Sequence, residues 1–164
     1  MAATNRNRVI TDYIQTGIYE TKSSVTTASN AMDVGAPSNY ERLMYLYGGD
    51  PEQIRADIES FSFSDENTIQ AIRDVYRQTS YLLDPHEAVS YLALREFLNN
   101  NNEEFGSGSG IFLETAHSKK FAGPVKNAVP LIAFPHDISG KKLEKISLEN
   151  NFQKLKDFII NLSS

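Results

Sequence analysis

Hydrophobic residues recur at helical spacing in several stretches of the chain, and polar residues or glycines separate these stretches. Near the N-terminus, four apolar residues share one helical face, namely Val9, Ile10, Tyr13 and Ile14. Gly17 follows them as a C-terminal stop, because glycine readily adopts the left-handed conformation that ends a helix. The pattern therefore predicts a short helix that ends just before Gly17.

Aspartate-proline pairs mark two further helix starts, Asp50-Pro51 and Asp84-Pro85. In each pair the aspartate can cap the helix, and the proline fits the first turn, where its missing N–H costs nothing. The helix after Asp84 should face inward through Ala88, Val89, Leu92, Leu94 and Phe97.

Three other helices follow from the same kind of pattern. One begins at a Ser38 or Asn39 cap and stops at Gly48-Gly49, and a second begins at an Asp65 cap and runs to about Thr79. The third is an amphipathic helix over 152–162.

Two stretches have the pattern of strands. Residues 61–64 alternate apolar and polar side chains, and the apolar stretch that begins at Ile111 stops abruptly at Thr115 and His117. Ligands gather beyond the carboxyl ends of strands in α/β proteins, so the second stretch is a candidate site. The alternative is an ordinary strand-to-helix turn with Thr115 as the cap. Together the patterns predict an α/β fold that is helix-rich and has a few short strands.

The length of 164 residues and the apolar content of 40% suit one core, so we expect a single portion over 1–164. Within it, residues 99–110 combine asparagine, glutamate and a glycine-serine run. This composition predicts a flexible loop.

Composition also narrows the class of function. A formal charge of −5 and a pI near 5.2 argue against binding to nucleic acid or to an anionic membrane, since both need a concentrated positive surface. The chain has no cysteine, and no apolar run approaches the roughly 18 residues of a membrane helix. We therefore expect a soluble protein of the cytoplasm.

Metal and phosphate motifs are incomplete. His86-Glu87 resembles the start of a zinc-protease helix, but Ser90 stands where that motif needs its second histidine. We expect His86 to hydrogen-bond to the cap instead, and we expect no metal ligands. The glycines of 106–110 lack the lysine and hydroxyl of a phosphate-binding loop.

Four stretches, in the same order and at plausible spacing, resemble threonine synthases. They are Ala2 to Asn7, Ser29 to Arg42, Leu83 to Val89 and Glu114 to Phe121. The resemblance spans roughly residues 2–130 and implies the C-terminal part of a fold-type II enzyme that depends on pyridoxal phosphate.

The chain departs from the family pattern at three places. Arg8 stands where the family usually has an acid, Glu87 replaces a small or hydroxyl residue, and Ser118-Lys119 replaces a proline-alanine pair. Glu87 adds negative charge beside His86 and puts the role of that helix start in doubt.

The resemblance implies a lyase of threonine biosynthesis that converts O-phospho-L-homoserine and water to L-threonine and phosphate. Thr115 matches the family residue whose hydroxyl faces the pyridine nitrogen of the cofactor. His117 and Lys120 are candidates for binding an anionic substrate or cofactor group; the alternative is a structural role in closing the strand-to-helix turn. Asn30 and Asp33 are candidates for substrate binding.

The lysine that forms the Schiff base and the glycine-rich loop for the cofactor phosphate lie upstream of these motifs in the family. Lys22, Lys119, Lys120 and Lys126 match no such motif. We therefore assign no catalytic residue here, and we expect the chain to be inactive alone, to need the N-terminal part of the same protein, and to self-associate. The alternative is a binding or assembly module without catalysis.

Overall fold

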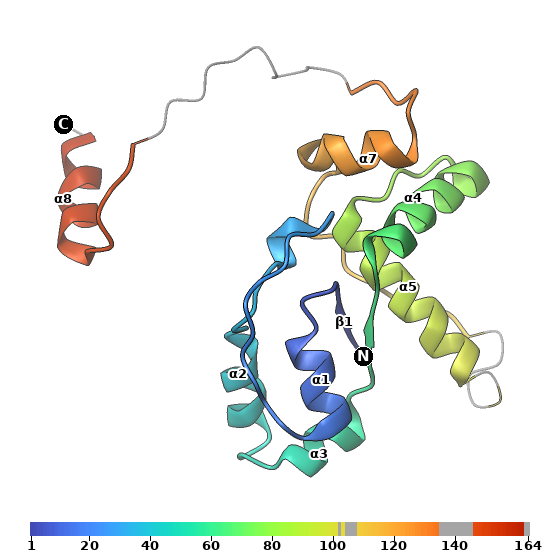
Figure 1. Ribbon diagram of the computed structural model, residues 1–164, viewed down its shortest axis with the longest axis horizontal. Coiled ribbons are helices and arrows are strands. Elements are labelled where there is room, and N and C mark those ends of the chain that lie inside the picture. Colours follow the sequence, from blue (N-terminus) through green and yellow to red (C-terminus); the bar gives the residue numbers. More distant parts are fainter. Residues whose placement is uncertain (102, 104–107, 135–145, 163–164) are drawn as a thin grey trace. The chain divides into compact units, whose positions relative to one another are not determined.

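The computed structural model describes residues 1–101, 103, 108–134 and 146–162, and most of its regular structure is helical (Figure 1). The chain divides into two compact units, Met1–Ala133 and Phe134–Ser164. That residues 1–164 form a single portion stays a prediction. Each unit is described by itself below.

The N-terminal end of the first unit contains the sheet. β1 (Ala2–Thr4) and β2 (Ser60–Ser62) pair in parallel, with Ala2 opposite Ser60. The strand predicted at 61–64 is therefore present, but it begins one residue earlier and ends two residues earlier. The fold is α/β and helix-rich, as predicted.

α1 (Val9–Thr16) packs against this sheet and shares one core with α2 (Asn39–Leu46) and α3 (Pro51–Asp57). Their shared core includes Ile10, Ile14 and Ile54, with three tyrosine rings at one side. The rings of Tyr19 and Tyr40 stack at 3.6 Å between centroids, and Tyr13 meets Tyr40 edge to face. The start of α3 is as predicted, because the Asp50 carboxylate accepts hydrogen bonds from two N–H groups of its first turn.

A second core lies between α4 (Asp65–Thr79), α5 (Pro85–Asn100) and α7 (Ala122–Ala128), and α4 packs against both of the other helices. Its buried members are Ala71, Ile72, Val75, Leu83, Ala88 and Ala128. Of the inward face predicted for α5, Ala88 and Val89 are buried, whereas Leu92, Leu94 and Phe97 are only partly covered. Two short 3-10 helices, η1 (Asn30–Met32) and η2 (Ser118–Phe121), complete the unit.

The predicted cap of α4 was wrong by one residue. Ser64 caps the helix in a reciprocal pair with Asn67, whose backbone N–H donates to the serine hydroxyl. The Asp65 carboxylate is engaged elsewhere, since it accepts a hydrogen bond from the N–H of Ala28.

The predicted strand that begins at Ile111 was also wrong. Among the described residues, none between 108 and 134 belongs to a strand. A strand needs a neighbour to take up its backbone groups, and the described sheet consists of β1 and β2 alone. Ile111 and Leu113 are accordingly exposed.

The loop predicted at 99–110 begins later than expected, because α5 continues through Asn100, and positions 102 and 104–107 lie outside the described residues. In the second unit, the predicted terminal helix is confirmed as α8 (Phe152–Leu162). Among the described residues, no helix has both the length and the apolar character that a membrane span requires.

Candidate functional site

His86 connects three segments that lie far apart in the sequence. Its backbone N–H and its ring Nδ1 both lie within hydrogen-bonding distance of Asp84 Oδ1, at 2.6 and 2.9 Å. On the other side of the ring, Nε2 accepts a hydrogen bond from the N–H of Ala31 at 3.2 Å. The ring also packs on Phe121, with 4.5 Å between centroids. His86 therefore ties η1, the start of α5 and η2 together.

These contacts define the tautomer of His86. Because Nε2 accepts a hydrogen bond, the proton sits on Nδ1 and is donated to Asp84. The prediction that His86 hydrogen-bonds to the cap of its helix is confirmed. Among the described residues, no three His, Cys, Asp or Glu side chains are arranged to hold a metal ion.

Asp33 holds the loop that contains η1. Its Oδ1 accepts hydrogen bonds from Asn5 Nδ2 at 3.0 Å, Asn7 Nδ2 at 2.9 Å and Thr27 Oγ1 at 2.6 Å, and its Oδ2 accepts one from the N–H of Thr27. The carboxylate is thus occupied by donors of this chain. Asn30, the other candidate in the loop, is exposed.

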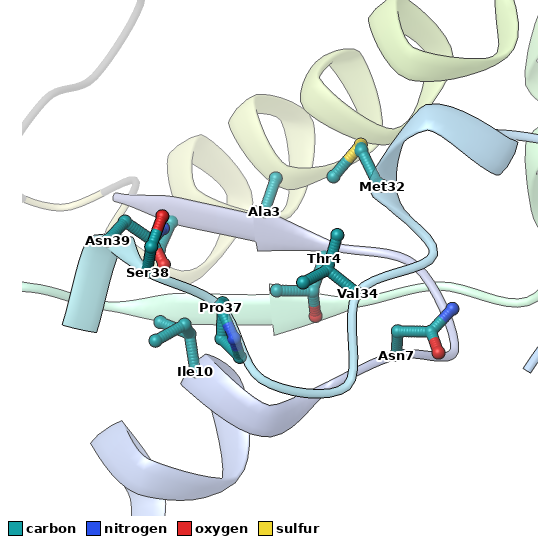
Figure 2. A pocket seen from close by; sticks show the side chains of 10 residues that line it. Ala3, Thr4, Asn7, Ile10, Met32, Val34, Pro37, Ser38 and Asn39 are labelled. Atoms are coloured by element: carbon teal, nitrogen blue, oxygen red, sulfur yellow. The ribbon is translucent and has the colours of Figure 1, made fainter. Parts of the chain in front are cut away.

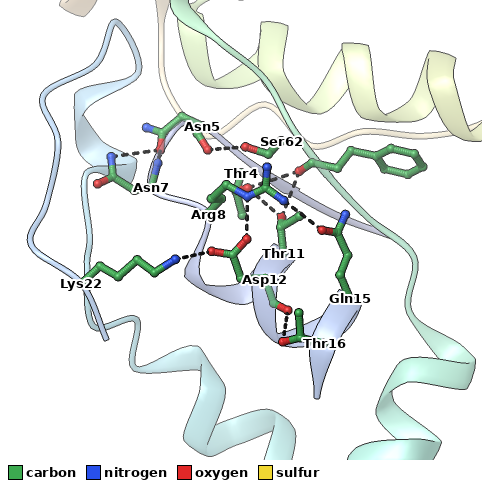
Figure 3. Close-up of polar contacts among 11 residues, drawn as sticks. Thr4, Asn5, Asn7, Arg8, Thr11, Asp12, Gln15, Thr16, Lys22 and Ser62 are labelled. Carbon is green, nitrogen blue, oxygen red and sulfur yellow. Dashed lines mark hydrogen bonds and ion pairs between the residues drawn. The ribbon is translucent and has the colours of Figure 1, made fainter. Parts of the chain in front are cut away.

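The same N-terminal residues are joined to β2 and α1 by further polar contacts (Figure 3). The Ser62 hydroxyl donates to the carbonyl of Asn5 at 2.7 Å, and the hydroxyls of Thr4 and Thr11 lie 2.8 Å apart. These bonds fix the position from which Asn5 reaches the η1 loop.

Arg8, which departs from the family pattern, forms an ion pair with Asp12 at 2.6 Å, and Lys22 pairs with the other oxygen of the same carboxylate at 2.6 Å (Figure 3). Burial acts to raise the pKa of Asp12, but the hydrogen bonds and charges of Lys22 and Arg8 outweigh it, so the pKa is lowered. Arg8 therefore has a structural partner in this chain.

A pocket of about 290 Å³ lies between β1, α1 and the loop after η1 (Figure 2). Its walls, as far as the structure describes the chain, carry no charged side chain; they are Ala2, Ala3, Thr4, Asn7, Ile10, Met32, Val34, Pro37, Ser38 and Asn39. Sequence reasoning missed this pocket, because its walls come from segments that only the fold brings together. Its largely apolar lining suits an apolar group better than a phosphate.

Thr115, His117 and Lys120 lie on the segment that leads into η2 and on η2 itself, and all three are exposed. His117 caps η2, because its ring Nδ1 accepts a hydrogen bond from the N–H of Lys119 at 3.2 Å. Within the described part of the chain, no hydrogen bond engages the Thr115 hydroxyl and no ion pair engages the Lys120 amine. The link from this group to Asn30 and Asp33 runs through His86, which contacts both η1 and η2.

Known proteins similar to this chain are threonine synthases, although no protein-family model matches it. The chain is 30% identical to threonine synthase of Buchnera aphidicola from Schizaphis graminum, over 98% of this chain and 36% of that protein. It is 35% identical to threonine synthase of Escherichia coli over 77% of this chain and 28% of that protein.

Solved structures agree. The crystal structure of threonine synthase from Escherichia coli matches with a TM-score of 0.76 and 30% identity, over 98% of this chain and 37% of that one. Threonine synthase from Brucella melitensis with bound pyridoxal phosphate matches with a TM-score of 0.66 and 25% identity, over 97% of this chain and 39% of that one.

The chain therefore belongs to the threonine synthase family. It matches a C-terminal part of these enzymes and spans about a third of the length of the curated relatives named above.

Proposed function

We propose that this chain acts as the C-terminal part of a threonine synthase, which converts O-phospho-L-homoserine and water to L-threonine and phosphate with pyridoxal phosphate. The observation that carries the proposal is the meeting of η1, the start of α5 and η2 at His86. These are the same stretches on which the resemblance to the family rests. A cytoplasmic location fits this role and stays a prediction.

Thr115 is suited to face the pyridine nitrogen of the cofactor. Its side chain is exposed, and within the described residues its hydroxyl has no hydrogen-bond partner, so the hydroxyl is free to donate. Pyridoxal phosphate, when bound, supplies an electron sink for the reaction. A neutral hydroxyl beside the ring nitrogen does not keep that nitrogen protonated, as an aspartate would. The cofactor ring therefore withdraws electrons less strongly.

His117 and Lys120 would bind anionic oxygens of the substrate or cofactor. With Nδ1 accepting from Lys119, the His117 proton sits on Nε2, which makes that nitrogen a donor. The Lys120 ammonium adds a point charge of the kind that binds phosphate. Asn30 offers an exposed amide to the substrate, whereas Asp33 acts indirectly by holding the loop of Asn30 in place.

The test uses the longer protein that contains this chain, with Thr115→Ala and Thr115→Asp as variants. We expect phosphate release from O-phospho-L-homoserine by the wild type, and altered cofactor absorbance and turnover in both variants. Folding should hardly change, because one lost hydrogen bond is worth about 1 kcal/mol.

Thr21→Ala is the matched control, because Thr21 is also exposed and lies in a different loop. Unchanged absorbance and kinetics in both Thr115 variants would remove Thr115 from the site. A longer protein that binds pyridoxal phosphate but releases no phosphate would refute the proposed reaction, and a native protein no longer than this chain would favour the non-catalytic module.

The chain alone should neither release phosphate nor bind the cofactor covalently, and it should self-associate. Several large apolar side chains are more than two thirds exposed, namely Ile18, Tyr45, Leu46, Ile111, Leu113, Leu131 and Phe152. Sedimentation that shows a strict monomer at high concentration would contradict self-association.

A further inference from the structure

The segment before Thr115 lies along one face of α5 through alternate residues. A Cβ added to Gly110 would meet Leu94 Cδ1 at 2.2 Å, so the glycine lies directly against that side chain. Two residues on, the ring of Phe112 meets that of Tyr91 edge to face at 6.0 Å. Since Leu94 and Tyr91 occupy one face of α5, Gly110 and Phe112 both lie against that face of the helix.

The odd-numbered residues of the segment are exposed. Ile111 and Leu113 are 87% and 75% exposed, and Thr115 is exposed too. Glu114 is exposed as well, so exposure does not alternate past Phe112, and no strand forms. Which way Thr115 is presented therefore depends on the contact that holds its neighbour, Glu114.

A tyrosine hydroxyl holds Glu114. Tyr81 Oη lies 3.2 Å from Glu114 Oε2 and 2.9 Å from Glu87 Oε1. Glu87 is 2% exposed, and its other oxygen accepts a hydrogen bond from the N–H of Asp84 at 2.8 Å. Ser80, in the left-handed conformation at φ +62°, ends α4 and turns the chain into Tyr81.

We propose that Tyr81 and Glu87 are positioning residues for Thr115. Glu87, anchored in the cap of α5, holds the Tyr81 hydroxyl, which holds Glu114 and thereby sets the side on which the Thr115 hydroxyl faces the cofactor. This role rests on the proposed function. It also explains Glu87, which stands where the family resemblance implies a small or hydroxyl residue.

Two hydrogen bonds join the Tyr81 hydroxyl to the carboxyl groups of Glu87 and Glu114, and each of these bonds needs a proton of its own. The Tyr81 hydroxyl has one hydrogen and cannot donate fully to two carboxylates. Burial, together with the negative charges of Glu114 and Asp84, raises the pKa of Glu87 against the lowering effect of its hydrogen bonds. With Glu87 ionised, the Tyr81 hydroxyl donates to Glu87 Oε1. The raised pKa of Glu87 makes protonation easier than for an ordinary glutamate, and whenever Glu87 carries a proton it can donate to the Tyr81 oxygen, which leaves the tyrosine hydrogen for Glu114.

The titratable groups that face Glu87 are Tyr81 from the turn after α4, Asp84 from its own cap and Glu114 from the segment. Within the described residues, no lysine or arginine forms an ion pair with Glu87. The chain of hydrogen bonds should therefore weaken as pH rises and Glu87 loses its proton.

The first experiment is a carboxyl ¹³C NMR titration of this chain. In Tyr81→Phe we expect the resonances of Glu87 and Glu114 to respond to each other less than in the wild type, because only the interaction between the two charges remains. Tyr45→Phe is the control, since Tyr45 is 85% exposed on α2. Independent titration in the wild type would overturn the bridge.

The second experiment uses the longer, cofactor-loaded protein. In Tyr81→Phe and Glu87→Thr, kcat should fall by about three- to tenfold with KM nearly unchanged, and the pH profile of cofactor absorbance should shift. Glu87→Gln should restore most of kcat, because the amide can still accept from Asp84 N–H and bond to Tyr81. Glu114→Ala, at an exposed position, should reproduce Tyr81→Phe without any effect on the core.

The outcomes separate the two proposals. If Thr115→Ala changes cofactor absorbance but Tyr81→Phe and Glu114→Ala do not, the positioning role is overturned alone. If Thr115→Ala also leaves cofactor absorbance unchanged, the proposed role of Thr115 is refuted, and the positioning role that depends on it is refuted as well.

Discussion

Replacing His86 with alanine should destabilise the first unit by about 3 kcal/mol, through three separate losses. The hydrogen bond from Ala31 N–H to Nε2 is worth about 1 kcal/mol, and the one from Nδ1–H to the Asp84 carboxylate about 1.5–3 kcal/mol. The ring contact with Phe121 adds about 0.5–1.5 kcal/mol. We expect the total to lie near the lower end of this sum, because the backbone N–H groups of positions 86 and 87 still donate hydrogen bonds to the Asp84 carboxylate in the variant.

Two milder variants separate these losses. The asparagine amide nitrogen lies about where Nδ1 lies, so His86→Asn keeps the donor to Asp84 and loses the acceptor for Ala31. The glutamine amide oxygen lies about where Nε2 lies, so His86→Gln keeps the acceptor instead. Both should fall between the wild type and His86→Ala, and His86→Gln alone should keep slow amide exchange at Ala31.

The assay is urea unfolding of the whole chain followed by circular dichroism, with hydrogen exchange at Ala31 as the local readout. His117→Ala is the control, because His117 is exposed and supports only the short η2; it should cost about 1 kcal/mol or less. If His86→Ala costs less than about 1 kcal/mol and leaves exchange at Ala31 unchanged, His86 does not join these segments.

Three further variants test single features of the structure. Asp12→Asn should remove a stabilisation that is present above the ordinary pKa of aspartate and lost as pH falls through the lowered folded value, so wild type and variant should converge in acid unfolding curves. Ser80→Gly should raise the urea midpoint, because Ser80 has a left-handed backbone that glycine adopts at no steric cost; a lower midpoint would contradict this. Gly110→Ala should destabilise by about 1–3 kcal/mol, because its Cβ would overlap Leu94, and the double variant with Leu94→Ala should recover part of that loss.

Helix boundaries followed from the sequence wherever the deciding contact is local. Gly17, Asp50 and Asp84 act on residues no more than four positions away, so their residue type and position were enough to predict helix ends. Asp65 shows the limit of such reasoning. It has the chemistry of a cap, but its carboxylate bonds to Ala28, which is distant in the sequence, and Ser64 takes the capping role.

The strands illustrate the same limit. β1 has no strand pattern of its own. It forms because Ala2–Thr4 pairs with β2, which lies far along the chain. The segment before Thr115 has the apolar pattern of a strand, but no described neighbour takes up its backbone. A strand depends on its partner, and a single stretch of sequence does not contain that partner.

The candidate site divides in the same way. The four family-like stretches, and Thr115, His117, Lys120, Asn30 and Asp33 within them, could be named from the sequence. The sequence did not reveal that Asp33 is already bound by Asn5, Asn7 and Thr27, or that Tyr81 bridges Glu87 and Glu114.

By itself, the sequence determined the family, most helices and their caps, because these depend on residue type and on spacing within a few positions. Only the tertiary structure decided that His86 joins η1 to η2, that Glu87 reaches Glu114 through Tyr81, and that an apolar pocket opens beside β1. Each of these contacts joins residues that folding alone brings within bonding distance.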